Sequence, residues 1–503
     1  MKSALFCSPE TELAPPREVF SSLGRKPIAA FILVSLLGLG LRFYHLTSQS
    51  LWQDEIGSIV AAETPLGRMY EASTKINNCL PTYPLLLSIF SPADPRDYDL
   101  VGRSLSAVAG ALSVPLFMAV VYLWRRQQGV AVCAGLLLAV NPLHIWYSQE
   151  MRPYAIVLML GLLTLLFFEL ARRDPKSQSY WWGLYLCAAF AAALFHKSGL
   201  IFPLLCFGWH GGELFLARRR FKELSIHIPI GLLMVLLQLV KSYPPGELYT
   251  RGRSILEIAY SLPAFLGGYS FGPSVTSIQT LGPTAAALRS LPELGIMAAA
   301  LALAGAAYAL NFRALRVGRE TWLFALDLGI VAAYSVVSRF PFNVRYALPA
   351  LLGFLAILSL FAGQVPGRAL ARASLAVVLA VSLWADAQWY YSPAYRKADA
   401  RGVAQWLMSN KESVRSWTGL PGYFNHCLRW YLSDPDLRDR ELPPVEDLRT
   451  DFPPTPDVLI LGRRHHVVQP DRIIAAYRAA AGPLATNLSF TGYEIYQRKE
   501  PQR

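Results

Sequence analysis

Charged side chains are scarce in this chain: only 16% of its 503 residues are Asp, Glu, Lys or Arg. Soluble globular proteins carry about 25%, so the shortage excludes an ordinary soluble fold for most of the sequence. Hydrophobic residues make up 53%, and they recur in runs of about the 20 residues that cross a bilayer as a helix. The composition therefore predicts a polytopic α-helical membrane protein.

Several other features are absent. The sequence has no internal repeat, no low-complexity tract and no convincing phosphate-binding glycine loop of the kind that nucleotide-binding enzymes use. The six cysteines show no metal-ligand spacing. Cys79 and Cys427 would share the outer compartment, where a disulfide is permitted, but the sequence does not show that they meet. No cleavable signal peptide is evident, because the first apolar run starts late and follows a polar segment.

The apolar runs predict about eleven transmembrane helices. The expected spans are residues 27–44, 104–124, 129–146, 153–170, 181–196, 198–217, 225–242, 291–311, 321–338, 345–363 and 370–391. Short basic clusters fall in every second loop between them, as the positive-inside rule requires of cytoplasmic loops. The net charge of +13 therefore reports membrane topology and not nucleic-acid binding. This pattern predicts a multi-pass protein of the inner (plasma) membrane with its N-terminus in the cytoplasm.

Two loops on the predicted outer side are long, residues 45–99 and 243–292. Residues 54–73 carry apolar side chains at helical spacing, which predicts one helix lying along the membrane surface. The apolar stretch 84–90 is too short to span and is expected to lie there as well. The second loop is rich in Gly, Pro, Tyr and Ser, and we expect a partly helical lid over a cavity.

The composition changes at Ser392 to that of a soluble domain of about 110 residues. An amphipathic helix is expected around residues 403–407 and a buried strand at 457–462. A further helix is expected at 472–480 and a closing strand at 493–496. We therefore predict a transmembrane domain over residues 1–391 and an extracytoplasmic α/β domain over residues 392–503.

A pair of acids, Asp54 and Glu55, opens the first outer loop just behind Trp52. Two interpretations compete. Asp54 could cap the N-terminus of the surface helix, since a carboxylate there satisfies orphan amides. Alternatively, a carboxylate beside the membrane could accept a proton from an acceptor hydroxyl. The motif alone favours capping.

Three further outer segments are rich in polar residues. They are residues 77–84, a turn before a short apolar helix, residues 141–154, which join two spans with almost no loop, and a pair of basic turns at 195–199 and 339–349. Cations on the outer side indicate an anionic ligand such as a lipid phosphate, for which Arg supplies a fork and Lys a point charge. The alternative is that Arg339 or Arg345 pairs with Glu55 or another acid.

Two acids lie within predicted spans, Asp327 and Asp386. Ionisable residues at membrane depth are functional candidates by default. Asp386 lies near the outer end of its span and could face the same cavity. Asp327 lies nearer the centre, where bonding to a neighbouring helix is the simpler interpretation.

Taken together, these residues resemble the membrane glycosyltransferases of the GT-C superfamily, and most closely the bacterial family 39 type. That type is related to protein O-mannosyltransferases and to the lipid A aminoarabinose transferase. The resemblance rests on these segments: Trp-x-Asp-Glu at 52–55, Tyr-Ser-Gln-Glu-Met-Arg-Pro-Tyr at 147–154, His-Lys-Ser-Gly at 196–199, Arg345-Tyr346 with Pro349, and the soluble tail. The family's His-Pro-Pro-Leu-Tyr segment corresponds to Cys-Leu-Pro-Thr-Tyr at 79–83, which lacks the basic residue and one proline.

The resemblance implies an inverting glycosyltransferase that moves a sugar from a polyprenyl-phosphate donor to an acceptor hydroxyl at the outer membrane face. It implies Asp54 as general base, with Glu55 orienting it or binding acceptor. The residues implied for the donor phosphate are Arg152, Lys197 and Arg345, and those implied for sugar or acceptor are Glu150, Tyr83, His196 and Tyr346. Neither a metal nor another cofactor is implied. The expected partners are the donor, membrane lipid and a protein, lipid or glycan acceptor, without nucleic acid.

Two other classes of function remain open. A lipid-linked sugar transporter or flippase should show repeats and binding residues near the bilayer midplane, whereas the polar groups here concentrate at the outer boundary. A non-catalytic scaffold of an envelope polysaccharide assembly would make the outer acids dispensable. For the transferase we expect the carboxylate of Asp54 and the cations to converge in a pocket open to the exterior.

Overall fold

The computed structural model describes residues 25–77, 80–218, 221–239, 258–274, 277–278, 281–315, 318–338, 342–363, 365, 367–443, 455–462, 467 and 469–499. The chain forms two compact units, each built from segments far apart in the sequence. The first unit comprises Met1–Leu46, Ala61–Gly268 and Gly295–Asp386, and the second comprises Thr47–Val60, Tyr269–Leu294 and Ala387–Arg503. The predicted domain boundary between residues 391 and 392 stays a prediction.

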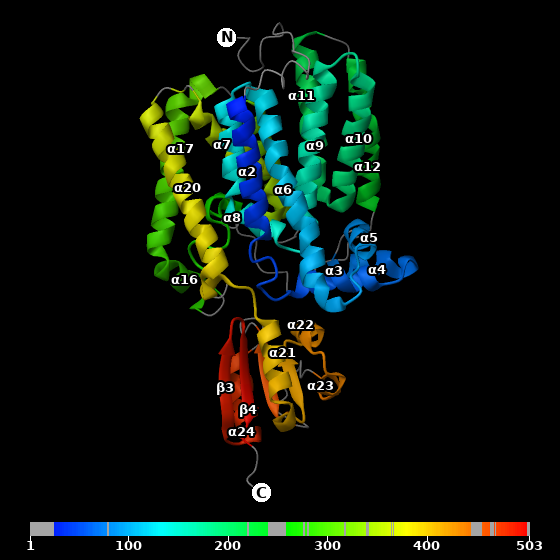
Figure 1. The fold of residues 1–503 in the computed structure, drawn as a ribbon, viewed down its shortest axis with the longest axis vertical. Helices are drawn as coiled ribbons and strands as arrows, with labels where there is room; N and C mark the ends of the chain where they lie inside the picture. The colour runs from blue at the N-terminus through cyan, green and yellow to red at the C-terminus, as the bar shows by residue number, and fades with distance from the viewer. Residues whose placement is uncertain are drawn as a thin grey trace. The chain divides into compact units, whose positions relative to one another are not determined.

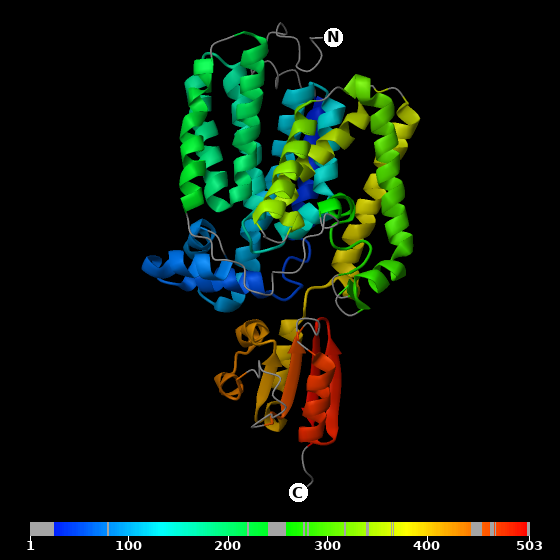
Figure 2. The ribbon, with the colours of Figure 1, turned by 180° about the vertical axis from the view of Figure 1, so that it is seen from behind.

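Long helices dominate the first unit, and α2, α6, α9 and α10 pack in succession, with α7 against α2 and α6 (Figures 1 and 2). The helices are α2 (Arg25–Phe43), α6 (Tyr98–Arg125), α7 (Gln128–Ala139), α9 (Tyr154–Arg173), α10 (Gln178–Phe195), α11 (Ile201–Leu216), α12 (Ile228–Leu239), α17 (Leu291–Leu315), α18 (Arg319–Ser338), α19 (Leu348–Ser359) and α20 (Arg368–Tyr391). Each predicted span is largely helical over its described residues. The predicted fold class, a polytopic α-helical membrane protein, is confirmed.

Within the described residues, 7 helices are long and apolar enough to cross a membrane, or 8 if one bent pair counts as a span. Helices α10, α12 and α18 fall outside that criterion, so the count of about eleven stays a prediction. The bent pair corrects the expected single span over residues 129–146. Helix α7 ends at Ala139, and α8 (Pro142–Ser148) continues at an angle of 59°.

Local chemistry at Asn141 and Pro142 explains this break. The side chain of Asn141 accepts a hydrogen bond from the amide of His144 at 3.0 Å and so caps α8. Pro142 then occupies the first turn, where its missing N–H costs nothing. The side-chain nitrogen Nδ2 of Asn141 donates a hydrogen bond to the backbone carbonyl of Phe265 at 2.7 Å. This bond connects the turn to the short helix α14 (Ser261–Gly267).

The first outer loop forms three helices, α3 (Gln53–Glu63), α4 (Leu66–Asn77) and α5 (Thr82–Ile89). The expectation of one continuous surface helix over residues 54–73 is wrong, because Pro65 separates α3 from α4. Ile56 and Ile59 are buried, whereas Leu66 and Tyr70 on α4 are exposed. The predicted short helix at 84–90 is present as α5.

Of the second outer loop, the described residues include α14 and α16 (Pro283–Arg289), so a partly helical loop is confirmed. Much of residues 240–257 lies outside the described residues. The expected lid over a cavity stays a prediction.

The C-terminal part of the second unit contains a four-stranded sheet in the order β1-β2-β4-β3 (Figure 1). The strands are β1 (Trp417–Leu420), β2 (Val458–Gly462), β3 (Leu484–Phe490) and β4 (Tyr493–Arg498). β1 and β2 are parallel and the other pairs antiparallel. The helices here are α21 (Ala400–Ser409), α22 (Asn425–Tyr431), α23 (Pro435–Asp439) and α24 (Pro470–Ala481). The predicted α/β fold is confirmed.

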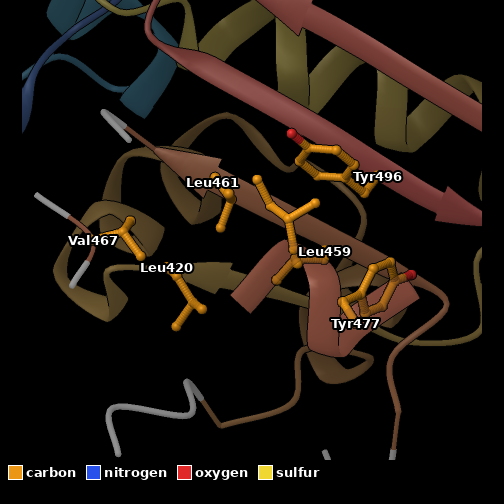
Figure 3. Packing of buried hydrophobic residues seen from close by; sticks show 7 residues of the cluster. Leu420, Leu459, Leu461, Val467, Tyr477 and Tyr496 are labelled. Atoms are coloured by element: carbon orange, nitrogen blue, oxygen red, sulfur yellow. The ribbon is translucent and has the colours of Figure 1, made fainter. Parts of the chain in front are cut away.

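Helix α24 packs on the sheet through a small apolar core (Figure 3). Leu459 and Leu461 are two apart on β2 and therefore point to the same face. Tyr477 of α24 and Tyr496 of β4 complete the core with them. The hydroxyl of Tyr477 donates to the carbonyl of Asp457 at 2.9 Å, so its buried polar end is satisfied.

A buried acid, Glu169, and a half-buried one, Glu213, form ion pairs with several basic residues of the predicted cytoplasmic clusters. Glu169 of α9 forms ion pairs with Arg172 at 3.7 Å, with Arg173 at 3.0 Å and with Arg319 of α18. Glu213 of α11 forms ion pairs with Arg172 and Arg319 as well. These arginines therefore join α9, α11 and α18 in addition to marking topology.

We expect Glu169→Gln to destabilise the protein by about 3 kcal/mol or more, because it removes a buried carboxylate that pairs with three arginines. Thermal unfolding of the detergent-solubilised protein measures this as a lower midpoint. Glu412→Gln is the matched control, since Glu412 is exposed. Equal midpoints for the two variants would contradict the role of the network.

Candidate functional site

The turn after α10 positions two predicted site residues, His196 and Lys197. The helix ends at Phe195, and His196 adopts an extended backbone with φ −163° and ψ 143°. Its Nδ1 accepts a hydrogen bond from the amide of Ser198 at 3.1 Å. Because Nδ1 accepts this bond, the proton of the neutral imidazole lies on Nε2, which can donate. Position 199 is a glycine because a Cβ there would collide with the carbonyl of Ala192.

A second turn, η5 (Val344–Ala347), positions Arg345 and Tyr346 at the start of α19. Asn343 fixes the turn, because its side chain accepts a hydrogen bond from the amide of Arg345 at 3.1 Å. The guanidinium of Arg345 lies 5.3 Å from the ring centre of Tyr346 and 5.6 Å from that of Tyr154. Such contacts with aromatic faces hold a cation without neutralising its charge.

The segment between α8 and α9 supplies Arg152, and Tyr154 is the first residue of α9. The carbonyl of Arg152 accepts a hydrogen bond from the hydroxyl of Ser106 at 3.0 Å, which anchors this turn to α6. The buried guanidinium of Arg152 lies 5.9 Å from the ring centre of Tyr154. Tyr154 was not among the predicted site residues, although it ends the motif at 147–154. Its ring contacts both arginines.

The imidazole of His196 connects the three turns. It stacks on Tyr346 with ring centres 5.7 Å apart and meets the ring of Tyr154 edge-on at 5.3 Å. Burial, followed by the positive charges of Arg345, Arg152 and Lys197, lowers the pKa of His196 from 6.5 to about 3. All three cations predicted to bind a phosphate thus act electrostatically on one neutral imidazole. We call these six residues the basic cluster: Arg152, Tyr154, His196, Lys197, Arg345 and Tyr346.

The lowered pKa of His196 makes a prediction about pH. An imidazole with a folded-state pKa near 3 stays neutral in the native protein, while the unfolded chain takes up the proton below about 6.5. The cluster therefore gains no charge from His196 as the pH falls from about 8 to about 5. We expect the ratio of polyprenyl-phosphate affinities, wild type to His196→Gln, to stay constant over that range in a binding titration. A ratio that rises below pH 6.5 would show that His196 becomes charged.

The segment at 79–83 lies against the same turn. Thr82 donates a hydrogen bond to the carbonyl of Leu194 at 2.9 Å, and Leu80 packs against Ala193 and Leu200. This places the start of α5 at the end of α10. Tyr83 is buried at 2% exposure. Cys79 lies outside the described residues, so its proposed pairing with Cys427 stays untested.

Glu150, predicted to bind sugar or to hold Arg152, is buried at 2% exposure. Its carboxylate accepts a hydrogen bond from the indole of Trp146 at 2.9 Å. That contact orients the carboxylate from within its own segment. A role toward a sugar stays a prediction.

Other polar residues of the motif support α2. The buried Arg42 donates to the carbonyls of Gly38, Leu138 and Ala139 at 2.8 to 3.0 Å, and it bonds Nδ1 of His144 at 2.6 Å. Gln149 donates to the carbonyl of Tyr44 at 2.8 Å. A cation at the C-terminus of a helix also complements the helix dipole. The polar residues of the motif at 141–154 thus divide between helix support and the basic cluster.

The two acids in predicted spans differ. The side chain of Asp327 on α18 accepts a hydrogen bond from the amide of Ala350 in the first turn of α19 at 2.8 Å. Asp327 thus bonds to a neighbouring helix. Asp386 is buried at 4% exposure, and neither of its oxygens has a hydrogen-bond partner among the described residues. Asp386 interacts electrostatically with Arg42. Its proposed place in a cavity stays untested.

The acid pair belongs to the second unit, where its two members have different roles. Glu55 is fully buried, and its carboxylate accepts a hydrogen bond from the amide of Trp52 at 3.2 Å. Because Glu55 stands three residues after Trp52, this is the return half of a capping box. The expectation that Asp54 also caps the helix stays a prediction. Asp54 is half-buried in the first turn of α3.

Among the residues that the structure describes, no three His, Cys, Asp or Glu side chains are grouped as metal ligands. The predicted convergence of Asp54 with the basic cluster stays a prediction.

The fold is that of a polytopic α-helical membrane protein with a small C-terminal α/β domain. The crystal structure of ArnT from Cupriavidus metallidurans in the apo state matches with a TM-score of 0.50 and 15% identity, over 93% of this chain and 97% of that one. The structure of that organism's ArnT bound to undecaprenyl phosphate gives a TM-score of 0.42 and 13% identity, over 95% of this chain and 100% of that one. The predicted resemblance is thus confirmed at the level of the fold.

No protein-family model matches the sequence. No curated protein matches it significantly either.

Proposed function

We propose that this protein is an inverting glycosyltransferase, which moves a sugar from a polyprenyl-phosphate donor to an acceptor hydroxyl at the outer face of the inner (plasma) membrane. The observation that carries the proposal is the basic cluster, in which the rings of Tyr154 and Tyr346 contact Arg152, Arg345 and the imidazole next to Lys197. A group of guanidinium and ammonium cations of this kind is suited to binding an anionic phosphate. The fold shared with ArnT supports the same class of function.

The basic cluster would bind the phosphate that links sugar to lipid. Each guanidinium presents a planar fork to two phosphate oxygens, and Lys197 adds a point charge. These groups matter most in the transition state, because negative charge builds up on the departing phosphate. The aromatic rings of Tyr154 and Tyr346 fix the arginines beforehand, so little reorganisation accompanies the reaction.

Asp54 would act as the general base. The acceptor oxygen attacks the anomeric carbon, and the bond from that carbon to the phosphate oxygen breaks. The bonding electrons leave with polyprenyl phosphate, and the acceptor proton passes to the carboxylate of Asp54. A single displacement of this kind inverts the anomeric carbon. Glu55 would hold the start of α3 and so orient Asp54.

The remaining predicted residues would recognise the sugar or the acceptor. Glu150 offers carboxylate oxygens to hydroxyl groups, while Tyr83 and Tyr346 offer phenolic ones. His196 would donate a hydrogen bond from Nε2 to the sugar or to a phosphate oxygen. These roles follow from the resemblance and from the side-chain chemistry.

Deletion of the gene in the native host tests the proposal. We expect one envelope glycan, glycolipid or glycoprotein to lose a sugar in mass spectra, while the corresponding polyprenyl-phosphate sugar accumulates. Purified wild-type protein should then release polyprenyl phosphate from that donor when given the sugar-deficient acceptor. Loss of the glycan without any release by the purified protein would indicate transport or scaffolding, and an unchanged envelope would remove the proposal.

A further inference from the structure

The segment before α3, residues 47–52, is held by residues of the C-terminal tail within the second unit. The amide of Leu51 donates to the hydroxyl of Tyr431 at 2.7 Å, and the amide of Lys397 donates to the side chain of Gln49 at 2.8 Å. The hydroxyl of Ser50 donates to Asp399 at 3.0 Å. We call the four tail residues Lys397, Asp399, Arg401 and Tyr431 the clamp.

Arg401 adds backbone contacts to this segment. Its amide donates to the hydroxyl of Ser50 at 3.2 Å, and its guanidinium donates to the carbonyl of Thr47 at 3.2 Å. The clamp thus meets several consecutive residues of the segment that leads into α3. These bonds provide hydrogen-bond partners for backbone groups of the segment.

The clamp is itself fixed to the α/β domain. The amide of Asp399 donates to the carbonyl of Thr491 at 2.8 Å, in the turn between β3 and β4. The carboxylate of Asp399 also accepts a bond from the amide of Gly402 at 2.9 Å and so caps α21. The position of the segment before α3 therefore depends on the folded tail domain.

One clamp residue reaches the acid pair. Nζ of Lys397 lies 3.5 Å from the carboxylate of Glu55, and the side-chain exposures of the two are 5% and 0%. Lys397 also lies 5.7 Å from the ring centre of Trp52. A buried carboxylate persists as an anion only when it is paired and hydrogen-bonded. The carboxylate of Glu55 is paired with Lys397 and accepts a hydrogen bond from the amide of Trp52.

We propose that Lys397 is a positioning residue for the catalytic carboxylate, acting through Glu55. The inference deepens the proposed function and rests on it, because Asp54 directly precedes Glu55 in the first turn of α3. With Glu55 held by the amide of Trp52 and by Lys397, the orientation of that turn, and with it that of Asp54, is fixed. Without Lys397 the buried carboxylate of Glu55 loses a cation 3.5 Å away, and the turn shifts in response.

The test compares Lys397→Met with wild type in the full-length protein. We expect kcat of sugar transfer to fall by about 10²-fold, since a displacement of about 1 Å costs that much, while KM for the donor changes by less than about 3-fold. Hydrogen exchange of the amides of residues 51–56 should become faster. Lys411→Met is the control, because Lys411 pairs with Asp434 and Asp436 elsewhere in the tail.

A double variant shows whether Lys397 acts through Glu55. Glu55→Gln with Lys397→Met removes both buried charges, and such replacements are often tolerated by the fold. We expect the double variant to lose no more activity than the worse single variant, because the two residues form one unit. The double variant also serves if Lys397→Met alone does not fold.

The outcomes separate this inference from the proposed function. If Asp54→Asn is inactive while Lys397→Met keeps its kcat and its amide protection, Lys397 is no positioning residue and the transferase stands. Multiplied losses in the double variant would also overturn the inference, because they show independent roles. If Asp54→Asn remains fully active, the catalytic assignment fails, and with it the role of Lys397.

Discussion

Asp54→Asn is expected to reduce sugar transfer to background, a loss of about 10³-fold or more. Asparagine has nearly the volume of aspartate but cannot take up the acceptor proton. The start of α3 should survive the change, because Glu55 and not Asp54 bonds the amide of Trp52. The hydroxyl of Ser58 bonds the backbone carbonyl of Asp54 at 3.0 Å, a contact that does not involve the side chain.

The measurement is release of polyprenyl phosphate, or of sugar-modified acceptor, by purified protein in lipid vesicles. Asp97→Asn is the matched control. Asp97 is an exposed acid of the same outer loop, and its side chain makes no capping hydrogen bond. We expect that control to retain wild-type kcat and both variants to elute and melt as wild type does. Full activity of Asp54→Asn would remove Asp54 as the base.

The helices could be predicted from the sequence because lipid imposes a simple requirement. A spanning segment must satisfy its backbone internally and be apolar for about 20 residues. Runs such as those of α2 and α9 meet that requirement, so their positions follow from composition. The same argument cannot find α3 and α4, whose ends depend on single residues such as Pro65.

The breaks in helices had local signals that periodicity overlooked. Asn141-Pro142 is a capping residue followed by a helix-starting proline, and this pair indicates a new helix within the apolar run at 129–146. In the tail, β1 is only four residues long and includes Gly419, while β3 is largely exposed. Short or exposed strands lack the continuous apolar run by which the buried strand β2 was predicted.

The residues of the candidate site could be proposed from the sequence, but their contacts could not. Lys197 and Arg345 stand out as cations on the predicted outer side, against the positive-inside rule, whereas Arg152 was implied by the family resemblance. Tyr154, the aromatic partner shared by Arg152 and Arg345, had no such signal, because a Tyr at a membrane boundary is ordinary. The pairing of Lys397 with Glu55 joins residues far apart in the chain, and no local pattern reports a contact of that kind.

Arg345→Met is expected to lower kcat/KM for the polyprenyl-phosphate donor by about 10²- to 10³-fold, as the loss of one preorganised donor to a developing oxyanion does. Methionine keeps much of the apolar stem, so the packing on Tyr154 and Tyr346 suffers less than the charge. Asn343 bonds the backbone amide of Arg345 and not its side chain, so η5 should retain its turn.

Arg345→Lys separates charge from geometry in the same assay. Lysine keeps the positive charge but lacks the planar fork that matches two phosphate oxygens, so we expect an intermediate loss of about tenfold. Arg68→Met is the matched control, since Arg68 is an exposed arginine on α4. If Arg345→Met and the control behave alike, the basic cluster does not bind the donor phosphate. A graded series from arginine through lysine to methionine would instead show that both the charge and the fork act on the departing phosphate.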